Sequence, residues 1–427
     1  MLPVPTCWRR RLKAIRLLQP LAEGDYALLT AGSLISLLGD GFFYVALAWK
    51  VYEISNVPTA LSVVGLAWTL PLVLFVLLGG VFSDRYDRRW LMVGADLVRA
   101  AAIAVLGLLS VWGILELWHV VALIAFVGLG DAFFNPASTA IVPDLLPDDQ
   151  LPRANALMAL LRPLMVRLIG PALGGFIVAG VGSGPAFLLD AASFVASAAA
   201  VLAITARPRR AITDHGVRQT LHEVREGLAF VRATPWVWAT LVSGMLSLLV
   251  FLGPQEVLLP FLVKNRLGLG PDALGSIFAV GGVGAILMAI TVGQLGQPRR
   301  RVTGMYASWS IGVLLIAGFG LMTALWQAML LSALIAGLFE FGQIIWTTLL
   351  QQLVPRELLG RVSSLDWLVS VGLVPVSFAL TGPIAGAIGA EWTMVAAGTS
   401  GAVLMGALLF APGVRDPERG FAGEAST

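Results

Sequence analysis

Long apolar stretches recur along the whole chain and are separated by short polar or Gly/Pro-rich breaks. Each stretch reaches the roughly 20 apolar residues that a helix needs to cross the hydrocarbon core of a bilayer. Barrel strands would instead alternate apolar with polar residues, and these stretches do not. The pattern therefore predicts an all-α membrane protein with about 12 transmembrane helices. They are expected at residues 26–52, 58–82, 90–113, 117–142, 154–180, 184–206, 237–263, 271–296, 303–323, 325–352, 363–389 and 391–411.

Composition and charge agree with a membrane location. Hydrophobic residues make up 58% of the chain, charged residues 12%, and the mean hydropathy is +0.86, whereas an average soluble domain has about 25% charged residues. Of the 28 Lys and Arg residues, 22 fall in the N-terminal segment, in every second break and in the C-terminal tail. Because basic loops are retained on the cytoplasmic side, we expect both termini in the cytoplasm. The chain is expected separately to lie in the cell (inner) membrane of a bacterium.

An internal duplication divides the chain, because residues 146–157 return as residues 354–365. The matched pairs are Pro147/Pro355, Asp149/Glu357, Leu151/Leu359, Arg153/Arg361 and Leu157/Leu365, all 208 residues apart, and, after a four-residue slip, Gly170/Gly382, Pro171/Pro383 and Gly174/Gly386. Two pseudo-symmetric six-helix bundles are therefore predicted.

Three parts are expected on this basis. Residues 1–206 form the N-terminal bundle with a basic cytoplasmic N-terminus, residues 207–236 form a cytoplasmic linker, and residues 237–427 form the C-terminal bundle and a short cytoplasmic tail. Apolar residues in the linker recur at helical spacing and predict an amphipathic helix. They are Leu221, Val224, Leu228 and Val231.

A dense charge cluster lies between the second and third apolar stretches. It reads Gly80-Val81-Phe82-Ser83-Asp84-Arg85-Tyr86-Asp87-Arg88-Arg89. It resembles the G-x-x-x-D-R-x-x-R-R signature of the major facilitator superfamily of secondary transporters, although an ordinary basic turn could have the same composition. The resemblance implies a gating role for Gly80, Asp84, Arg85, Arg88 and Arg89. In that role Asp84 would face the positive N-terminus of the eleventh span, an attraction of about 0.3–1 kcal/mol.

A second motif lies in the fifth span, where Gly170-Pro171-Ala172-Leu173-Gly174-Gly175 is similar to the G-P-x-x-G-G of drug:proton antiporters. Its glycines allow close backbone contact and its proline favours a kink, so a plain helix-packing patch is the alternative interpretation. Three further runs make the chain resemble the enterobactin and macrolide exporter group. These runs are residues 39–41, 133–137 and 147–155.

Ionisable residues inside the spans are the candidates for proton coupling. Isolated charges in hydrocarbon cost about 2.5–3.5 kcal/mol and usually face a cavity, and a carboxyl removed from water binds a proton more readily. The candidates are Asp40, Asp131, Glu256 and Glu340, which fall in spans 1, 4, 7 and 10. The resemblance implies that these four spans line a central cavity. Asp40 is the first choice and Asp131 the second, and the alternative is a structural carboxylate that is hydrogen-bonded or paired with an arginine.

Three arginines within the spans are possible charge partners: Arg99, Arg162 and Arg167. On an α-helix Arg162 and Arg167 would lie about 140° apart and could not both face one cavity squarely. Two further acids, Asp96 and Asp366, lie near cytoplasmic ends, where a gate or a helix-terminus contact is expected. Asp190, near the outer end of the sixth span, is interpreted as structural.

Other functional classes lack their motifs. The three lysines offer no G-K-[ST] for ATP, and the single Cys7 excludes internal disulfides. His119, His215 and His222 form no H-E-x-x-H, so neither catalytic residues nor a metal or other cofactor are expected. The net charge of +3 follows from the topology and implies no nucleic-acid partner.

The residues and the resemblance together predict a proton-coupled exporter that works by alternating access as a monomer in the lipid bilayer. Its substrate would be a small amphipathic or apolar molecule such as a drug, a siderophore or a macrolide-like compound. Aromatic residues could line the cavity or pack against lipid: Phe42, Phe43, Trp68, Phe133 and Trp346. Two alternatives stay open, an importer or lipid flippase of the same fold and a membrane sensor that transports nothing.

Overall fold

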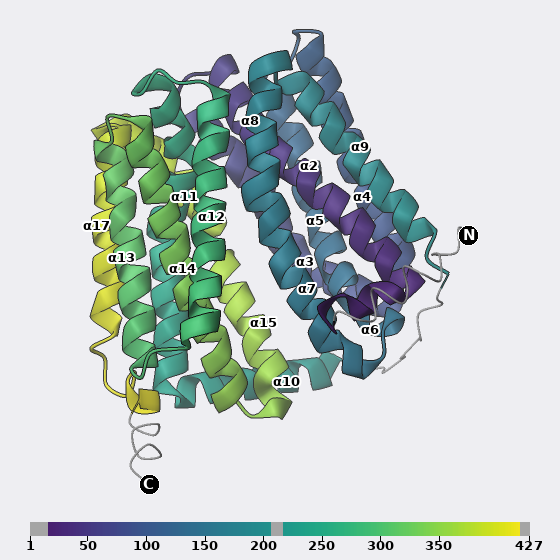
Figure 1. Cartoon of the computed structure of the whole chain (residues 1–427), viewed down its shortest axis with the longest axis vertical. Helices are drawn as coiled ribbons and strands as arrows, with labels where there is room; N and C mark the ends of the chain where they lie inside the picture. Colours follow the sequence, from purple (N-terminus) through teal and green to yellow (C-terminus); the bar gives the residue numbers. More distant parts are fainter. Residues whose placement is uncertain (1–15, 206–216, 419–427) are drawn as a thin grey trace. The chain divides into compact units, whose positions relative to one another are not determined.

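The computed structural model describes residues 16–205 and 217–418, and helices make up nearly all of that part of the chain (Figure 1). The elements are η1 Arg16–Ala22, α2 Gly24–Ile54, α3 Pro58–Arg85, α4 Arg88–Val111, α5 Leu117–Ala140, α6 Val142–Leu145, η2 Asp148–Gln150, α7 Leu151–Pro163, η3 Leu164–Ile169, α8 Gly170–Val181, α9 Ser183–Leu202, α10 Val217–Ala233, α11 Pro235–Asn265, α12 Pro271–Leu295, α13 Arg301–Leu321, α14 Leu325–Leu353, α15 Arg356–Gly372, α16 Val374–Ile388 and α17 Ala390–Leu408.

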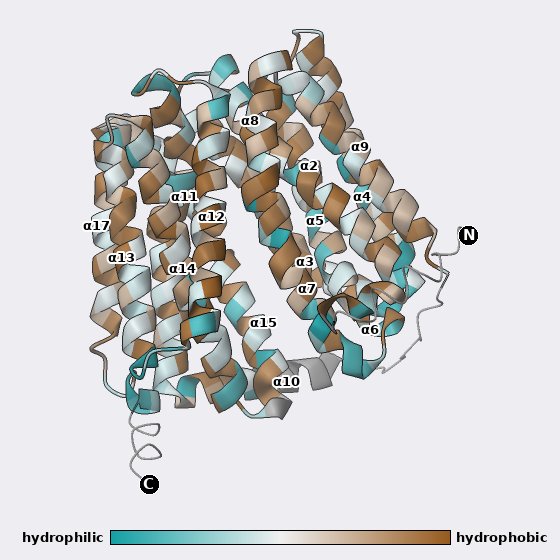
Figure 2. Ribbon diagram, viewed as in Figure 1, coloured by the Kyte–Doolittle hydropathy of each residue, from teal (hydrophilic) through white to brown (hydrophobic). Residues whose placement is uncertain are grey.

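The all-α membrane fold is confirmed. Within the described residues, 11 helical segments are long and apolar enough to cross a membrane. The last predicted span corresponds to α17, a helix of 19 residues that falls outside that set, so about 12 membrane helices agree with the structure. Figure 2 shows hydrophobic residues along the lengths of the helices and hydrophilic residues mainly at their ends. This distribution follows from the need to keep charged side chains out of hydrocarbon.

The helices pack into two compact units. The first consists of Met1–Asn56, Ala67–Ile212 and Gly270–Ala279, and the second of Val57–Leu66, Thr213–Leu269 and Val280–Thr427. In the first unit α4 packs on α5 and α9, and α2 packs on α8 and α9. In the second unit α13 packs on α14 and α17, and α11 packs on α16 and α17. The two units therefore repeat one packing pattern, as the duplication in the sequence predicts.

Equivalent turns also join the last two helices of each unit. Gly182 links α8 to α9 with φ +88°, and Gly389 links α16 to α17 with φ +87°. This region of backbone conformation suits glycine because it has no Cβ. The two glycines with positive φ at equivalent turns are a second structural sign that the two units are duplicated.

A helix, α10, occupies the segment before the second set of spans and packs on α11 and α15. Val231 is buried on one side of it, whereas Arg225 and Arg232 are exposed. The predicted division at residues 207–236 stays a prediction, since residues 206–216 lie outside the described residues. Cys7, His215, the basic residues before position 16 and the tail after position 418 also lie outside them.

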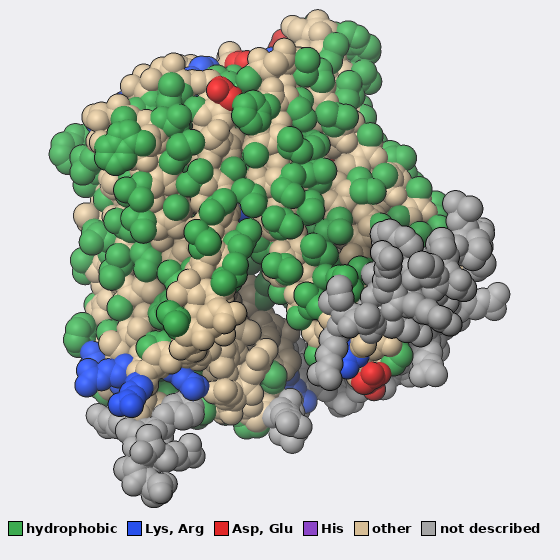
Figure 3. Space-filling model, in the orientation of Figure 1, with side chains coloured by type: hydrophobic (Ala, Val, Ile, Leu, Met, Phe, Trp, Pro, Cys, Tyr) green, Lys and Arg blue, Asp and Glu red, His purple; other side chains and the backbone are tan. Residues whose placement is uncertain are grey.

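Charged side chains are sparse on the sides of the helices and gather at helix ends. Figure 3 shows Lys and Arg side chains clustered at one end of the second unit, beside the start of α13. Arg299 and Arg300 there are exposed, directly before α13 begins at Arg301. This cluster occupies the place in the second repeat that the charged loop occupies in the first.

Candidate functional site

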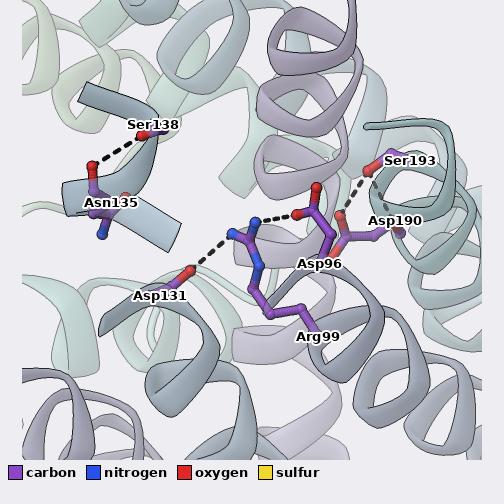
Figure 4. A network of polar contacts seen from close by, with 7 residues as sticks. All are labelled: Asp96, Arg99, Asp131, Asn135, Ser138, Asp190 and Ser193. Atoms are coloured by element: carbon purple, nitrogen blue, oxygen red, sulfur yellow. Dashed lines mark hydrogen bonds and ion pairs between the residues drawn. The ribbon is translucent and has the colours of Figure 1, made fainter. Parts of the chain in front are cut away.

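A buried ion-pair network connects α4 and α5 in the first unit. Arg99 on α4 is only 4% exposed, and its Nη1 donates to Oδ1 of Asp131 on α5 at 2.9 Å. Its Nη2 donates to Oδ1 of Asp96, one turn earlier on α4, which is fully buried. Figure 4 shows the guanidinium between the two carboxylates. One arginine therefore pairs with two acids at once.

Aromatic rings hold the Arg99 side chain in place. The guanidinium carbon lies 4.2 Å from the ring centroid of Phe134 and 4.4 Å from that of Phe194. A Cβ on Gly130 would lie 2.6 Å from Cγ of Arg99, so glycine makes room for the arginine stem. Cation–π contacts of this kind contribute about 2 kcal/mol when the cation is desolvated. They help to stabilise a charge that is costly to bury.

Both carboxylate oxygens of Asp131 have donors. Oδ2 accepts a hydrogen bond of 2.9 Å from Nε1 of Trp68 on α3, in addition to the Arg99 bond to Oδ1. The Trp68 ring in turn contacts Phe43 with a centroid distance of 5.8 Å and Tyr44 with one of 5.4 Å. This arrangement favours the paired, structural interpretation of Asp131.

Asp40 lies between two glycine contacts on α2. A Cβ on Gly39 would lie 2.5 Å from Oδ1 of Asp190 on α9, and a Cβ on Gly41 would lie 2.5 Å from Cα of Gly170. Close approach of α9 and α8 on either side therefore sets the position of Asp40. Its carboxyl is half-buried, makes no hydrogen bond to a residue in the described part of the chain, and lies within electrostatic reach of Asp96, Arg99, Asp131 and Arg162.

The fifth span is not one continuous α-helix. It consists of α7, the π-helix η3 and α8, and the Gly170 N–H donates to the carbonyl of Met165 five residues earlier. Short π-helical segments occur often at functional sites. The angle of about 140° expected between Arg162 and Arg167 assumed a regular α-helix, whereas Arg167 lies in the π-helix. Both arginines are exposed.

The remaining glycines of the second motif are packing positions. A Cβ on Gly174 would lie 2.8 Å from Cα of Phe42, and one on Gly175 would lie 2.8 Å from the carbonyl oxygen of Pro271. Pro171 itself is buried. The motif thus brings α8 against α2 directly beside Asp40. The helix-packing contact and the candidate residue for proton coupling are therefore adjacent.

The charged loop ties helix ends together within the first unit. Asp87 caps α4 by accepting from the Arg89 backbone N–H at 2.9 Å. Arg88 Nη1 donates to Oδ2 of Asp144 at 2.6 Å and to the carbonyl of Ala140 at 2.9 Å. Arg89 Nη2 donates to the carbonyl of Leu202 at the end of α9 at 3.1 Å. Asp87 and Asp144 were not among the predicted site residues, yet both have defined roles here.

The other predicted gating residues of that loop, Gly80, Asp84 and Arg85, lie in open surroundings within their unit. A Cβ on Gly80 would meet no atom within 4 Å, so close helix contact within its unit does not explain this glycine. Asp84 and Arg85 are exposed. The expected partner of Asp84, the start of the eleventh span, belongs to the other unit, and their contact stays a prediction.

The predicted acids of the second unit, Glu256 on α11 and Glu340 on α14, are half-buried. A further acid there is Asp366 on α15, whose Oδ2 accepts from Nε1 of Trp346 at 3.1 Å. Trp346 is buried and packs edge-on against Trp236 with a centroid distance of 5.8 Å. Trp346 is therefore a core residue of its unit.

Sequence reasoning undervalued Asp96 and Asp190, which the structure brings beside the predicted network. The spacing of Asp96 and Arg99 offered a signal, because residues three apart share a helix face. For Asp190 the sequence carried no comparable signal, since its neighbours come from a helix about 150 residues away. Only the packing of α9 on α2 makes it a member of the cluster.

Comparisons with known proteins agree with this architecture. The family described as transmembrane secretion effector matches residues 15–418. The multidrug efflux pump Tap of Mycolicibacterium fortuitum is 27% identical over 412 residues, which are 93% of this chain and 97% of that protein. Macrolide efflux protein A of Streptococcus pyogenes is 25% identical over 372 residues, covering 86% of this chain and 91% of that protein.

Solved structures share the fold. A bacterial homologue of the human lysosomal transporter Spinster superimposes with a TM-score of 0.66 at 16% identity, covering 94% of this chain and 98% of its own. The nucleoside transporter NupG superimposes with a TM-score of 0.67 at 12% identity, covering 90% and 98%. At such identities the likeness shows the fold alone.

Proposed function

The chain belongs to the major facilitator superfamily, in the transmembrane secretion effector family, and on that premise we propose that it is a proton-coupled exporter of a small amphipathic or apolar molecule. Its relatives include proteins named as multidrug and macrolide efflux pumps. In this proposal the two units alternate access to a central site, both termini are cytoplasmic and the protein acts as a monomer.

The observation that carries the coupling proposal is the environment of Asp40. It is a half-buried carboxyl within a membrane helix, without a hydrogen bond among the described residues, next to a network that already uses the charge of Arg99. A carboxyl that lacks a fixed donor can exchange a proton without breaking a structural bond. Asp131 is less suited, because protonation there would disturb its bonds to Trp68 and Arg99.

The energetics of such a cycle are sufficient. One charge that crosses the membrane potential gains about 2.3 kcal/mol per 100 mV. A proton entering across about 150 mV thus supplies about 3.5 kcal/mol, enough for a several-hundred-fold substrate gradient. The contact of Gly41 with Gly170 offers a mechanical link, because a change at Asp40 would act directly on the π-helical joint of the fifth span.

Transport in inverted membrane vesicles tests the proposal. A drug-susceptibility panel in an efflux-deficient host first selects the probe, beginning with macrolides. Vesicles energised by respiration should then accumulate the radiolabelled probe, a protonophore should abolish the gradient, and Asp40→Asn should insert normally without accumulating it. Accumulation in right-side-out vesicles with the same protonophore sensitivity would instead identify an importer. Wild-type accumulation by inserted Asp40→Asn would reject Asp40 as the coupling residue.

A further inference from the structure

Asp190 on α9 is a fully buried carboxyl that the ion-pair network does not neutralise. Its Oδ2 has no hydrogen-bond partner in the described part of the chain. Its Oδ1 accepts only a long bond of 3.3 Å from Oγ of Ser193, and that hydroxyl also donates to the Asp190 backbone carbonyl at 2.7 Å. Figure 4 shows the side chain directed from α9 toward Asp96 and Arg99. An ionised carboxylate with one unpaired oxygen at such a position is costly.

The charges around Asp190 do not offset a further negative charge. The elements packed against α9 contribute Asp40 from α2 and both Asp96 and Arg99 from α4, whereas α8 carries no charged residue. Asp131 on α5 is also within electrostatic reach. The two Nη atoms of Arg99 already serve Asp96 and Asp131. Both Nη groups of the arginine are therefore directed at other acids, and among the described residues Asp40 and Asp190 have no cationic hydrogen-bond donor.

The contact between α2 and α9 places Asp190 against the helix that carries Asp40. Gly39 packs so closely on α9 that a Cβ there would lie 2.5 Å from Oδ1 of Asp190 and 2.2 Å from Oγ of Ser193. Asp40, the next residue on α2, lies within electrostatic reach of Asp190. Carboxyls that interact electrostatically in a low-dielectric interior bind and release their protons as a pair and not independently.

We propose that Asp190 is a second proton-binding carboxyl of the exporter and that it shares the proton load of the transport cycle with Asp40. The proposal rests on the proposed function for the use of the protons, and on the geometry alone for the existence of the site. Asp40 is the half-buried member of the two, whereas Asp190 is fully enclosed. Each binds a proton as a neutral carboxylic acid and returns it as a carboxylate, so a cycle that uses both moves two protons.

Infrared difference spectroscopy tests the site without a substrate. Purified full-length protein in lipid nanodiscs is compared between an acidic and an alkaline pH, and the carboxylic C=O stretching region reports every acid that gains a proton. The wild type should show two titrating bands from the membrane interior. Asp190→Asn should remove one of them, Asp40→Asn should remove the other and retain the Asp190 band, and the double variant should remove both.

Two further variants keep the result interpretable. Ser193→Ala removes the hydroxyl that bonds Oδ1 of Asp190, so it should displace the Asp190 band while the acid remains. Asp148→Asn changes an exposed acid in η2, just before α7. It is the matched control and should change neither band. If Asp190→Asn does not assemble, the displacement in Ser193→Ala decides the matter.

The possible outcomes separate this proposal from the proposed function. A carboxylic region that is identical in wild type and Asp190→Asn, or unmoved bands in Ser193→Ala, would overturn the assignment of Asp190. Full export activity in Asp40→Asn vesicles would remove the coupling role of Asp40 and would leave an observed Asp190 band intact. Loss of accumulation in Asp190→Asn vesicles, together with loss of its band, would connect the site to transport.

Discussion

Arg99 illustrates how a membrane-embedded charge is stabilised at the level of single residues. Two carboxylates and two phenyl rings surround its guanidinium, and Gly130 leaves space for its stem. A lysine would offer a compact ammonium without the planar fork that serves two acids at once. The network is therefore specific for arginine. Asp96 and Asp131 depend on the Arg99 guanidinium to offset the cost of their burial.

Replacement of Arg99 should destabilise the first unit. Arg99→Met leaves Asp96 and Asp131 without their cation, and breaking a buried pair costs about 3–5 kcal/mol. The thermal stability of Arg99→Lys should lie between that of Arg99→Met and that of the wild type. The measurement is the midpoint of thermal aggregation of detergent-purified protein, with the exposed Arg225→Met as the matched control. Equal midpoints for Arg99→Met and Arg225→Met would show that the network contributes nothing to stability.

Elements of this fold meet through glycines, because a small side chain lets two helix backbones approach closely. The contacts of Gly39 with α9 and of Gly41 with Gly170 lie on either side of Asp40. In the same way, the π-helix η3 and Pro171 interrupt the fifth span where it meets α2. The close helix contacts therefore surround Asp40, the candidate residue for proton coupling.

Gly174→Ala, which adds one methyl group, should impair transport without preventing membrane insertion. Its Cβ would lie 2.8 Å from Cα of Phe42, so α2 and α8 must separate, and overpacking of this kind costs about 1–3 kcal/mol. Gly180→Ala on the same helix is the matched control, since a Cβ there meets nothing within 4 Å. Vesicle transport and membrane yield are compared for the two variants. Equal transport rates would show that this contact has no functional role.

The duplicated segment contains one arginine in each repeat, Arg153 and Arg361. Each arginine contacts the short helix that precedes the six membrane helices of its own repeat. Arg153 on α7 bonds Gln19 of η1, and Arg361 on α15 bonds Glu226 of α10. Both arginines occupy the same place in the repeat, 208 residues apart. The elements η1 and α10 therefore make equivalent contacts in the two repeats.

Charge reversal tests the second of these contacts. Arg361→Glu and Glu226→Arg should each weaken the attachment of α10 to α15, because each places two like charges together. The double variant should restore an attraction between opposite charges. Because the pair is partly exposed, the coupling energy should be below about 1 kcal/mol. Limited proteolysis within α10 measures the effect, and Arg225→Glu on the same helix serves as the control. A double variant that is cleaved as fast as the two single variants would refute the pairing.

At the scale of the whole molecule, alternating access requires a residue whose contacts differ between states. Asp84 is exposed and makes no hydrogen bond or ion pair with a residue that the structure describes, unlike Arg88 and Arg89 in the same loop. It is therefore available to bias the conformational equilibrium, and a bias of this kind changes rates more than it changes substrate contacts.

Asp84→Asn should lower turnover by a larger factor than it lowers substrate affinity. If it loses about 1 kcal/mol of attraction to a helix N-terminus, the balance between states shifts by about fivefold. A single cysteine introduced at the predicted outer ends of the helices, after Cys7→Ser, reports the shift as a changed labelling rate. Asp87→Asn is a suitable comparison, because that residue lies in the same loop and caps α4 within its own unit. An unchanged labelling rate with reduced affinity alone would reject the gating role.

Properties that depend on local sequence were predictable for this protein. Apolar length predicted the membrane helices to within a few residues at most ends, since crossing hydrocarbon requires a fixed number of residues. The repeat at 208 residues predicted two equivalent packing patterns, and the charge motif indicated the family. The pairing of Arg99 with Asp96 and Asp131, the π-helix before Gly170 and the burial of Asp190 were decided only by tertiary structure. They depend on how each helix is rotated about its axis and on which helix packs beside it, and an apolar segment does not encode either property locally.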